Sequence, residues 1–268
     1  MAFHRAALRA VDPARAVARH LARAGSEVVL RRGAAGVPRR HAGPIRLVAA
    51  GKAAARMATA ALPILGDAFE RGLVIVPEAG PAPPDVPGLV CLRGSHPIPG
   101  PGSLAAAEAA LDLARGARSD TLLLVLLSGG ASALMAAPAE GLTLADKRDV
   151  TAALLASGAD VQALNVVRRH SSRIKGGGLL RAAAAAAGVW TLALSDVLGD
   201  DPAAIGSGPT SADPTTFGDA AVVLARWAPA AAPAIRAALA EGTAGRRAET
   251  VKPGDPLLDR AAFVVVGS

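Results

Sequence analysis

Six short apolar runs, separated by segments of helix length, constrain the fold of this chain more than any other feature. They span residues 45–51, 72–77, 89–94, 121–127, 189–196 and 263–268. Runs without alternating polar positions are typical of strands buried on both faces of a sheet. Helical patterns lie between them, at 53–62, 103–115, 143–156, 161–169, 177–187 and 218–226. The alternation predicts an α/β fold, with a mostly parallel sheet and helices on both faces, as in Rossmann-like layered domains.

Local signals mark several element ends. Asp12-Pro13 predicts the N-cap and first turn of a helix, and Thr143 with Asp146 predicts a capping box. The proline-rich stretch 77–88 predicts a loop, whereas the alanine run 182–187 predicts a continuing helix because alanine has the highest helix propensity.

The composition argues against two classes of protein. The 268-residue chain is 51% hydrophobic and 19% charged, with a net charge of +7, but its arginines are scattered and its aromatic content is 2%. A base-stacking surface for nucleic acid is therefore hardly available. No apolar run approaches the ~18 residues of a membrane span, and the first ten residues lack the apolar core of a signal peptide. With a single cysteine, Cys91, we expect a cytoplasmic protein. The sequence leaves open whether it forms a homo-oligomer.

Small and polar residues follow four of the predicted strands. They are Gly51-Lys52, Ser95-His96-Pro97, Ser128-Gly129-Gly130 and Ser195-Asp196. In an open parallel sheet these positions share one edge, where ligands bind. Glycines let the backbone approach a ligand, and N–H groups at a helix start attract an anion.

Each of these motifs has an alternative interpretation. A strand followed by Gly129-Gly130 is also typical of a tight turn. Lys52 is also typical of a solvated lysine at the start of a helix. A cation is poorly placed at the positive end of a helix, however, and a bound anion would offset the charge of Lys52. The segment 170–180 predicts a second anion site, because His170, Ser172, Arg173 and Lys175 precede three glycines. Three glycines are also typical of a helix break.

The segment 194–219 combines acidic residues with glycines, prolines and hydroxyls. The acidic residues are Asp196, Asp200, Asp201, Asp213 and Asp219. Carboxylates beside glycine-cradled anions fit magnesium-assisted phosphoryl transfer. Gly51-Lys52 lacks the rest of a phosphate-binding P-loop, and no Gly-x-Gly-x-x-Gly follows a strand. A serine nucleophile is weakly supported, and five dispersed histidines with one cysteine argue against zinc.

Five motifs in order resemble the N-terminal domain of the glycerate 2-kinase family, also called glycerate kinase type-2 or the MOFRL-associated, DUF4147-like family. They are "GKAAARM", "GSHPIP", "LLSGGASALM", "LNVVRRHSSRIKGGGLL" and "LSDVLGDDPAAIGSGPTSADPTT". The resemblance implies ATP-dependent phosphorylation of D-glycerate to 2-phosphoglycerate with Mg²⁺. The cleft would lie between this domain and a C-terminal one.

The motifs and the resemblance together suggest roles for individual residues. Lys52 would neutralise a phosphoryl group or hold the glycerate carboxylate, and Asp196 would be the general base or a metal partner. The remaining predicted binding residues are Ser128, Gly129, Gly130, Ser132, Ser172, Lys175, Ser207, Gly208 and Thr210.

Two departures from the family pattern bear on these expectations. Gly100 stands where the family commonly has an acidic residue. The family's C-terminal domain is missing, so residues 1–240 are predicted to form the N-terminal domain and 241–268 a linker with the first strand of a truncated second one. We expect that strand to be frayed, exposed or paired with another chain, and the chain alone to have little kinase activity. A hydroxypyruvate reductase using NAD(P) and a non-catalytic anion-binding fragment are the alternatives.

Overall fold

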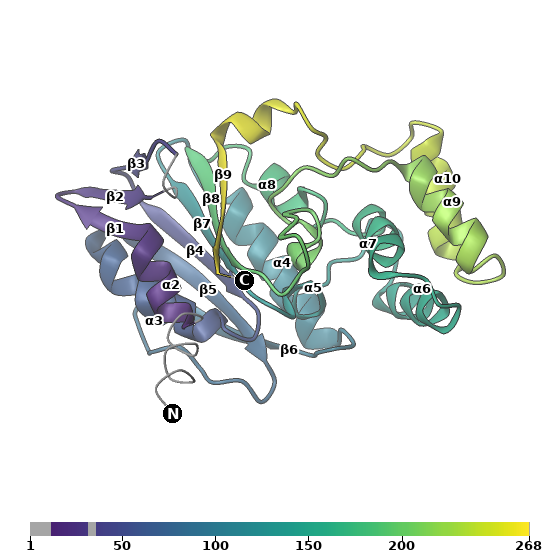
Figure 1. Cartoon of the computed structure of the whole chain (residues 1–268), viewed down its shortest axis with the longest axis horizontal. Coiled ribbons are helices and arrows are strands. Elements are labelled where there is room, and N and C mark those ends of the chain that lie inside the picture. The colour runs from purple at the N-terminus through teal and green to yellow at the C-terminus, as the bar shows by residue number, and fades with distance from the viewer. Residues whose placement is uncertain (1–11, 32–35, 268) are drawn as a thin grey trace.

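A parallel sheet forms the centre of the molecule. The computed structural model describes residues 12–31 and 36–267. The six strands follow the order β6-β5-β4-β7-β8-β9, and all neighbours run parallel (Figure 1). They are β4 (Ile45–Ala50), β5 (Phe69–Pro77), β6 (Leu89–Gly94), β7 (Leu122–Leu127), β8 (Gly188–Leu194) and β9 (Ala261–Gly267). The predicted α/β class is confirmed.

The chain enters this sheet at its centre. From β4 it moves outward to β5 and β6, then crosses to β7 on the other side of β4 and continues to β8 and β9. The strand order therefore reverses between β4 and β7. In open α/β sheets, ligands bind at this point, outside the carboxyl ends of the strands.

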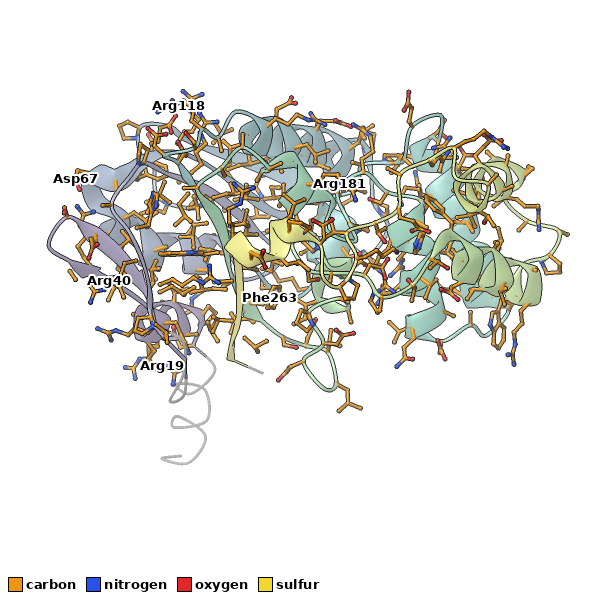
Figure 2. The ribbon with its side chains drawn as sticks, turned by 90° about the horizontal axis from the view of Figure 1, so that it is seen from above. Arg19, Arg40, Asp67, Arg118, Arg181 and Phe263 are labelled. Atoms are coloured by element: carbon orange, nitrogen blue, oxygen red, sulfur yellow. The ribbon has the colours of Figure 1, made fainter. Side chains whose placement is uncertain are left out.

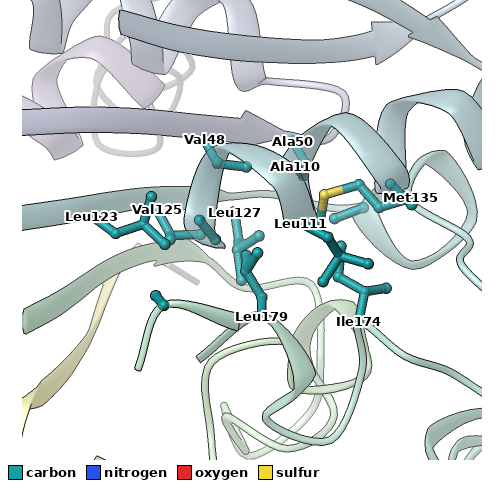
Figure 3. Close-up of a cluster of buried hydrophobic side chains, with 14 of the residues drawn as sticks. Val48, Ala50, Ala110, Leu111, Leu123, Val125, Leu127, Met135, Ile174 and Leu179 are labelled. Carbon is teal, nitrogen blue, oxygen red and sulfur yellow. The ribbon is translucent and has the colours of Figure 1, made fainter. Parts of the chain in front are cut away.

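Helices cover both faces of the sheet. They are α2 (Pro13–His20) and α3 (Ala54–Leu65) on one face, and α4 (Pro101–Arg115) and α8 (Gly178–Ala182) on the other. Alternate residues of β7 enter the two cores: Leu122 and Leu124 pack towards α2 and α3, and Leu123 and Val125 towards α4 and α8 (Figure 3). A strand that enters two cores must be apolar along its whole length, which is the pattern that predicted it.

Four more helices form a group beside the sheet. They are α6 (Leu144–Ala156), α7 (Val161–His170), α9 (Phe217–Trp227) and α10 (Pro233–Thr243). Their own apolar core includes Leu154, Val167 and Leu224. Seen from above, these helices lie at the opposite end of the molecule from Arg40 and Asp67 (Figure 2). The sequence did not predict α10.

The remaining elements are short. A three-stranded antiparallel sheet consists of β1 (Leu21–Ala24), β2 (Glu27–Leu30) and β3 (Arg39–His41), which the sequence also did not predict. The short helices are α5 (Ala131–Leu134), η1 (Gly66–Ala68), η2 (Ile205–Ser207) and η3 (Pro256–Arg260). Among the described residues, no helix has the length and apolar character needed to cross a membrane.

Several predicted element ends are confirmed and one is wrong. Asp12 caps α2, Thr143 and Asp146 form a capping box on α6, and 78–88 is a loop. The alanine run, however, leaves the helix at Ala182. The N–H of Ala187 donates to the carbonyl of Thr121 (2.9 Å), so the chain must turn there to enter β8. Strand pairing thus overrides the helix propensity of alanine.

The strand β9 lies at the edge of the sheet. Its residues pair with β8 from Val189 to Leu194, so it continues the same sheet as the preceding strands. The domain boundary at residue 240 stays a prediction. Ser268 and the first ten residues, on which the signal-peptide prediction rests, lie outside the described residues.

Candidate functional site

The loops after β4 and β7 are fastened to each other where the strand order reverses. The N–H of Lys52 donates to the carbonyl of Gly129 (2.9 Å), and the N–H of Ala53 donates to Oγ of Ser128 (3.0 Å). Gly51 has φ = 128°, and a Cβ atom there would lie 2.2 Å from Oγ of Ser128. Only glycine allows this approach, so Gly51 fixes the two loops side by side.

Three ionisable side chains meet at the next two glycines. A Cβ atom on Gly129 would lie 2.4 Å from Oδ2 of Asp196. One on Gly130, whose φ is 89°, would lie 3.0 Å from Cδ2 of His96 and 3.6 Å from Cγ of Lys52. Lys52 precedes α3, His96 follows β6 and Asp196 follows β8. We call Lys52, His96 and Asp196 the switch-point cluster.

The switch-point cluster has no partners within the described part of the chain. The ammonium of Lys52, the ring nitrogens of His96 and the carboxylate of Asp196 make no hydrogen bond or ion pair there. All three residues are exposed. Partial desolvation and the positive charge of Lys52 lower the pKa of His96 below its usual value, against the opposing effect of Asp196. Charged groups without structural partners at the carboxyl ends of parallel strands are candidates for ligand contacts.

The backbone between these side chains has free donors. The N–H groups of Gly129, Gly130 and Ser132 donate no hydrogen bond to another described residue. Adjacent free N–H groups at a turn attract anions, and here Lys52 adds a positive charge. Ser128, Gly129 and Gly130 are thus brought together with Lys52 and Asp196, as the sequence predicted.

A second polar group lies behind this loop. Nζ of Lys175 donates to the carbonyl (2.6 Å) and Oγ (2.8 Å) of Ser132, and Oγ of Ser132 is 2.9 Å from Oγ of Ser207. Ser207 in turn donates to Oδ1 of Asn165 (3.1 Å). Burial, and then the charges of Lys147 and Arg168, hold the pKa of Lys175 well below its usual value. This group supports α5 from the interior of the protein.

The other predicted binding residues make structural contacts. Oγ of Ser172 donates to the carbonyl of Ala137 (3.0 Å), and the buried Thr210 has its Oγ1 2.7 Å from Oγ1 of Thr191 in β8. The carbonyl of Gly208 accepts from the N–H of Gly177 (2.7 Å). No hydrogen bond or ion pair joins Ser172, Gly208 or Thr210 to the switch-point cluster among the described residues. Their role in binding stays a prediction.

Most of the acidic residues in the segment 194–219 also serve the fold. Asp213 is fully buried and pairs with Arg169 (2.9 Å), Asp201 accepts from the N–H of Ala203, and Asp219 caps α9. In the described part of the chain, no three His, Cys, Asp or Glu side chains are grouped to hold a metal ion. The carboxylate of Asp196, by contrast, lies against Gly129 of the candidate site.

Two residues of these groups were absent from the predicted site. His96 was noted on the ligand edge of the sheet but was given no role, although it is the ionisable residue of the motif that follows β6. Asn165 lies within α7, and nothing in a helical pattern signals its contact with Ser207.

Comparisons with known proteins show the family of the chain. Residues 1–240 match the family model of DUF4147, a domain of unknown function. The chain belongs to this family. It is 43% identical over 219 residues to a putative hydroxypyruvate reductase of Agrobacterium vitis, covering 82% of this chain and 48% of that protein. It is 38% identical over 218 residues to the glycerate 2-kinase of Pyrococcus horikoshii, covering 81% of this chain and 47% of that protein.

The crystal structure of glycerate kinase from Thermotoga maritima has the same fold. The TM-score is 0.80 at 30% identity, covering 98% of this chain and 57% of that one. The resemblance of the motifs to the glycerate 2-kinase family is confirmed by these matches. The chain spans about half the length of the curated relatives it matches.

Proposed function

We propose that this chain takes part in the ATP-dependent phosphorylation of D-glycerate to 2-phosphoglycerate. The observation that carries the proposal is the switch-point cluster: a lysine, a histidine and an aspartate without partners in the described chain, beside three free backbone N–H groups. Phosphoryl transfer is catalysed mainly by positioning and charge stabilisation, and this arrangement offers both. Glycerate kinases among its relatives support the choice of substrate.

The cluster fits an anionic substrate and a nucleotide-bound metal ion. The cradle of Gly129 and Gly130, which side chains would fill, would bind phosphate or carboxylate oxygens through N–H groups. Lys52 would neutralise the transferring phosphoryl group or the glycerate carboxylate. Asp196 supplies one unpaired carboxylate, and Mg²⁺ in such sites takes one or two carboxylates with phosphate oxygens and water. Bound there, Mg²⁺ would neutralise phosphate charge.

The reaction requires a hydroxyl of D-glycerate to face the γ-phosphorus of ATP. As the new O–P bond forms, the bond from the γ-phosphorus to the bridging oxygen breaks, and ADP leaves with the electron pair. Lys52 would stabilise the charge on the transferring group, and the amide groups of Gly129 and Gly130 would hold it in line.

A dehydrogenase is the second candidate. The strand order reverses as it does in dinucleotide-binding sheets, and two relatives are named putative hydroxypyruvate reductases. The loop after β4, however, presents Lys52 in place of the glycine-rich fingerprint that lets a pyrophosphate approach the backbone. A change in nicotinamide absorbance on mixing with hydroxypyruvate would favour this candidate over the kinase. If the protein binds anions but catalyses neither phosphorylation of D-glycerate nor reduction of hydroxypyruvate, the non-catalytic fragment is favoured.

Lys52→Ala tests the kinase directly. In the complete natural protein, with ATP, Mg²⁺ and D-glycerate, ³¹P NMR should detect 2-phosphoglycerate, and the variant should lose ~10²-fold or more of the rate. Arg56→Ala is the matched control, because it removes an exposed cation one turn further along α3. We expect Arg56→Ala to stay within ~3-fold of wild type. Absence of product from the wild-type protein would refute the proposed function.

A further inference from the structure

His96 is set apart from the other described histidines by its ring nitrogens. His20, His41 and His170 each have one ring nitrogen within 2.9–3.2 Å of a backbone carbonyl oxygen. Neither ring nitrogen of His96 has a hydrogen-bond partner in the described chain. The imidazole edge carrying Nε2 lies against Gly130, where a Cβ atom would be 3.3 Å from Nε2. An unpartnered imidazole beside an anion cradle is available to a ligand.

The backbone around His96 brings it to the cradle from a distant strand. β6 is at the edge of the sheet, three places from β7. Gly94, its last residue, packs so closely on α5 that a Cβ atom would lie 2.8 Å from the carbonyl oxygen of Leu134. The N–H of Ser95 donates to Oγ of Ser103 (3.0 Å), which fixes the start of the loop. These contacts hold His96 beside Gly130.

We propose that the imidazole of His96 accepts the proton of the hydroxyl group that is phosphorylated, which makes His96 a catalytic residue. The inference rests on the proposed function. The hydroxyl oxygen forms a bond to the γ-phosphorus, the bond to the bridging oxygen breaks with its electron pair on ADP, and the hydroxyl proton moves to a ring nitrogen of His96. In this arrangement Asp196 would bind the metal ion and would not accept the proton.

The charges around His96 support this division of roles. Partial desolvation and then the charge of Lys52 lower the pKa of His96, which favours the neutral imidazole that can accept a proton. Asp196 acts in the opposite direction and would stabilise the imidazolium that forms. A general base is most effective when its pKa is near the working pH. The ordinary pKa of an imidazole is closer to neutral pH than that of a carboxylate.

The first experiment needs no turnover. In the 268-residue chain, the ring ¹⁵N and ¹H resonances of His96 are assigned by their loss in His96→Gln and followed during titration with D-glycerate. We expect the His96 resonances to shift and those of His20, which is bonded to the carbonyl of Ala16, to stay unchanged. Unmoved His96 resonances at saturating D-glycerate, with binding confirmed by calorimetry, would overturn the proposal.

The second experiment measures proton transfer in the complete natural protein. His96→Gln keeps a planar polar side chain at an exposed position, so thermal unfolding should match wild type. We expect kcat to fall ~10²-fold, KM for D-glycerate to change less than ~3-fold, and the acid limb of the pH–kcat profile to disappear. For His96→Ala, added imidazole should restore part of the rate.

The outcomes separate this inference from the proposed function. A wild-type protein that makes no 2-phosphoglycerate refutes both. A wild-type protein that makes it, together with His96→Gln that keeps kcat and the acid limb, refutes only the role of His96.

Discussion

The carboxylate of Asp196 lies against Gly129, where a Cβ atom would come within 2.4 Å of Oδ2. Because the N–H of Gly129 is also free, this residue faces both an anion cradle and an acidic side chain. An anion and a carboxylate side by side repel each other unless a cation lies with them. Lys52, and Mg²⁺ in the proposed function, would supply that positive charge.

Gly129→Ala should therefore impair the site more than the fold. The new methyl group meets only the end of an exposed side chain, so Asp196 can rotate away at small cost in stability. We expect a change in Tm below ~3 °C and a loss of ~10-fold or more in phosphoryl transfer. Gly218→Ala is the control, because its Cβ atom would lie 3.4 Å from Oγ1 of Thr216, an ordinary contact. Equal rates of phosphoryl transfer for Gly129→Ala and Gly218→Ala would show that a side chain at Gly129 does not impair the site.

Asp196→Asn tests the carboxylate without changing its shape. The side chain has no partner within the described chain, so the free energy of unfolding should not change measurably. We expect the rate in the complete natural protein to fall ~10²-fold, and the Mg²⁺ concentration for half-maximal rate to rise. An unchanged rate with unchanged Mg²⁺ dependence would remove Asp196 from both the metal-binding and the catalytic role.

Asp213→Asn addresses stability rather than chemistry. The carboxylate is fully buried, pairs with Arg169 at 2.9 Å, and accepts hydrogen bonds from Thr215 and Thr250. The variant leaves the guanidinium of Arg169 buried without its counter-charge, so urea unfolding should show a loss of ~3 kcal/mol. Asp219→Asn, at an exposed helix cap, should cost only ~1 kcal/mol or less.

The same pair predicts how stability responds to acid. Burial acts to raise the pKa of Asp213, but hydrogen bonds from Thr215 and the charge of Arg169 lower it below its usual value. A depressed carboxylate pKa stabilises the folded state above the unfolded pKa, and the contribution is lost as the pH falls below ~4. Asp213→Asn should accordingly unfold with a weaker dependence on pH between ~2 and ~4 than wild type.

The sheet and the strand-end residues could be predicted because they follow from local sequence. A run such as Leu122 to Leu127 enters two cores, so its pattern is uniform and easily read. Strand order is not local: it arises from packing of the whole chain, and it decides that the loops after β4 and β7 meet. The convergence of Lys52 and Asp196 on one cradle could therefore be expected only from the general rule for parallel sheets.

Side-chain partners were less predictable than positions. Lys175 and Ser132 are both in predicted anion motifs, yet they bind each other behind the cradle. Thr210 is close in sequence to Ser207 but bonds to Thr191 of β8. Asp213 and Asp196 lie in the same loop-rich segment, and only burial and the ion pair with Arg169 distinguish the structural carboxylate from the free one. These differences depend on contacts across the fold, which a single sequence does not contain.

Lys147 allows a prediction about alkaline pH. Its Nζ donates to the carbonyl (2.9 Å) and Oγ (3.0 Å) of Ser171, and burial, followed by the charge of Arg168, lowers the pKa of Lys147 to about 7. In the unfolded chain a lysine has a pKa of ~10.4. Between these values the unfolded state binds one more proton than the folded state, so the free energy of unfolding rises with pH.

Lys147→Met should remove this part of the pH dependence. The slope of the free energy of unfolding between ~pH 7 and ~pH 9 should be lower than in wild type by up to ~1.4 kcal/mol per pH unit. Urea unfolding of wild type and Lys147→Met at several pH values measures this slope. Lys175, the other buried lysine, is present in both proteins, so its contribution is the same in each. Arg148→Met is the matched control, because it removes an exposed cation from the same helix and should leave the slope unchanged. Parallel curves for wild type and Lys147→Met would show that Lys147 stays protonated in the folded protein, held as a cation by Ser171.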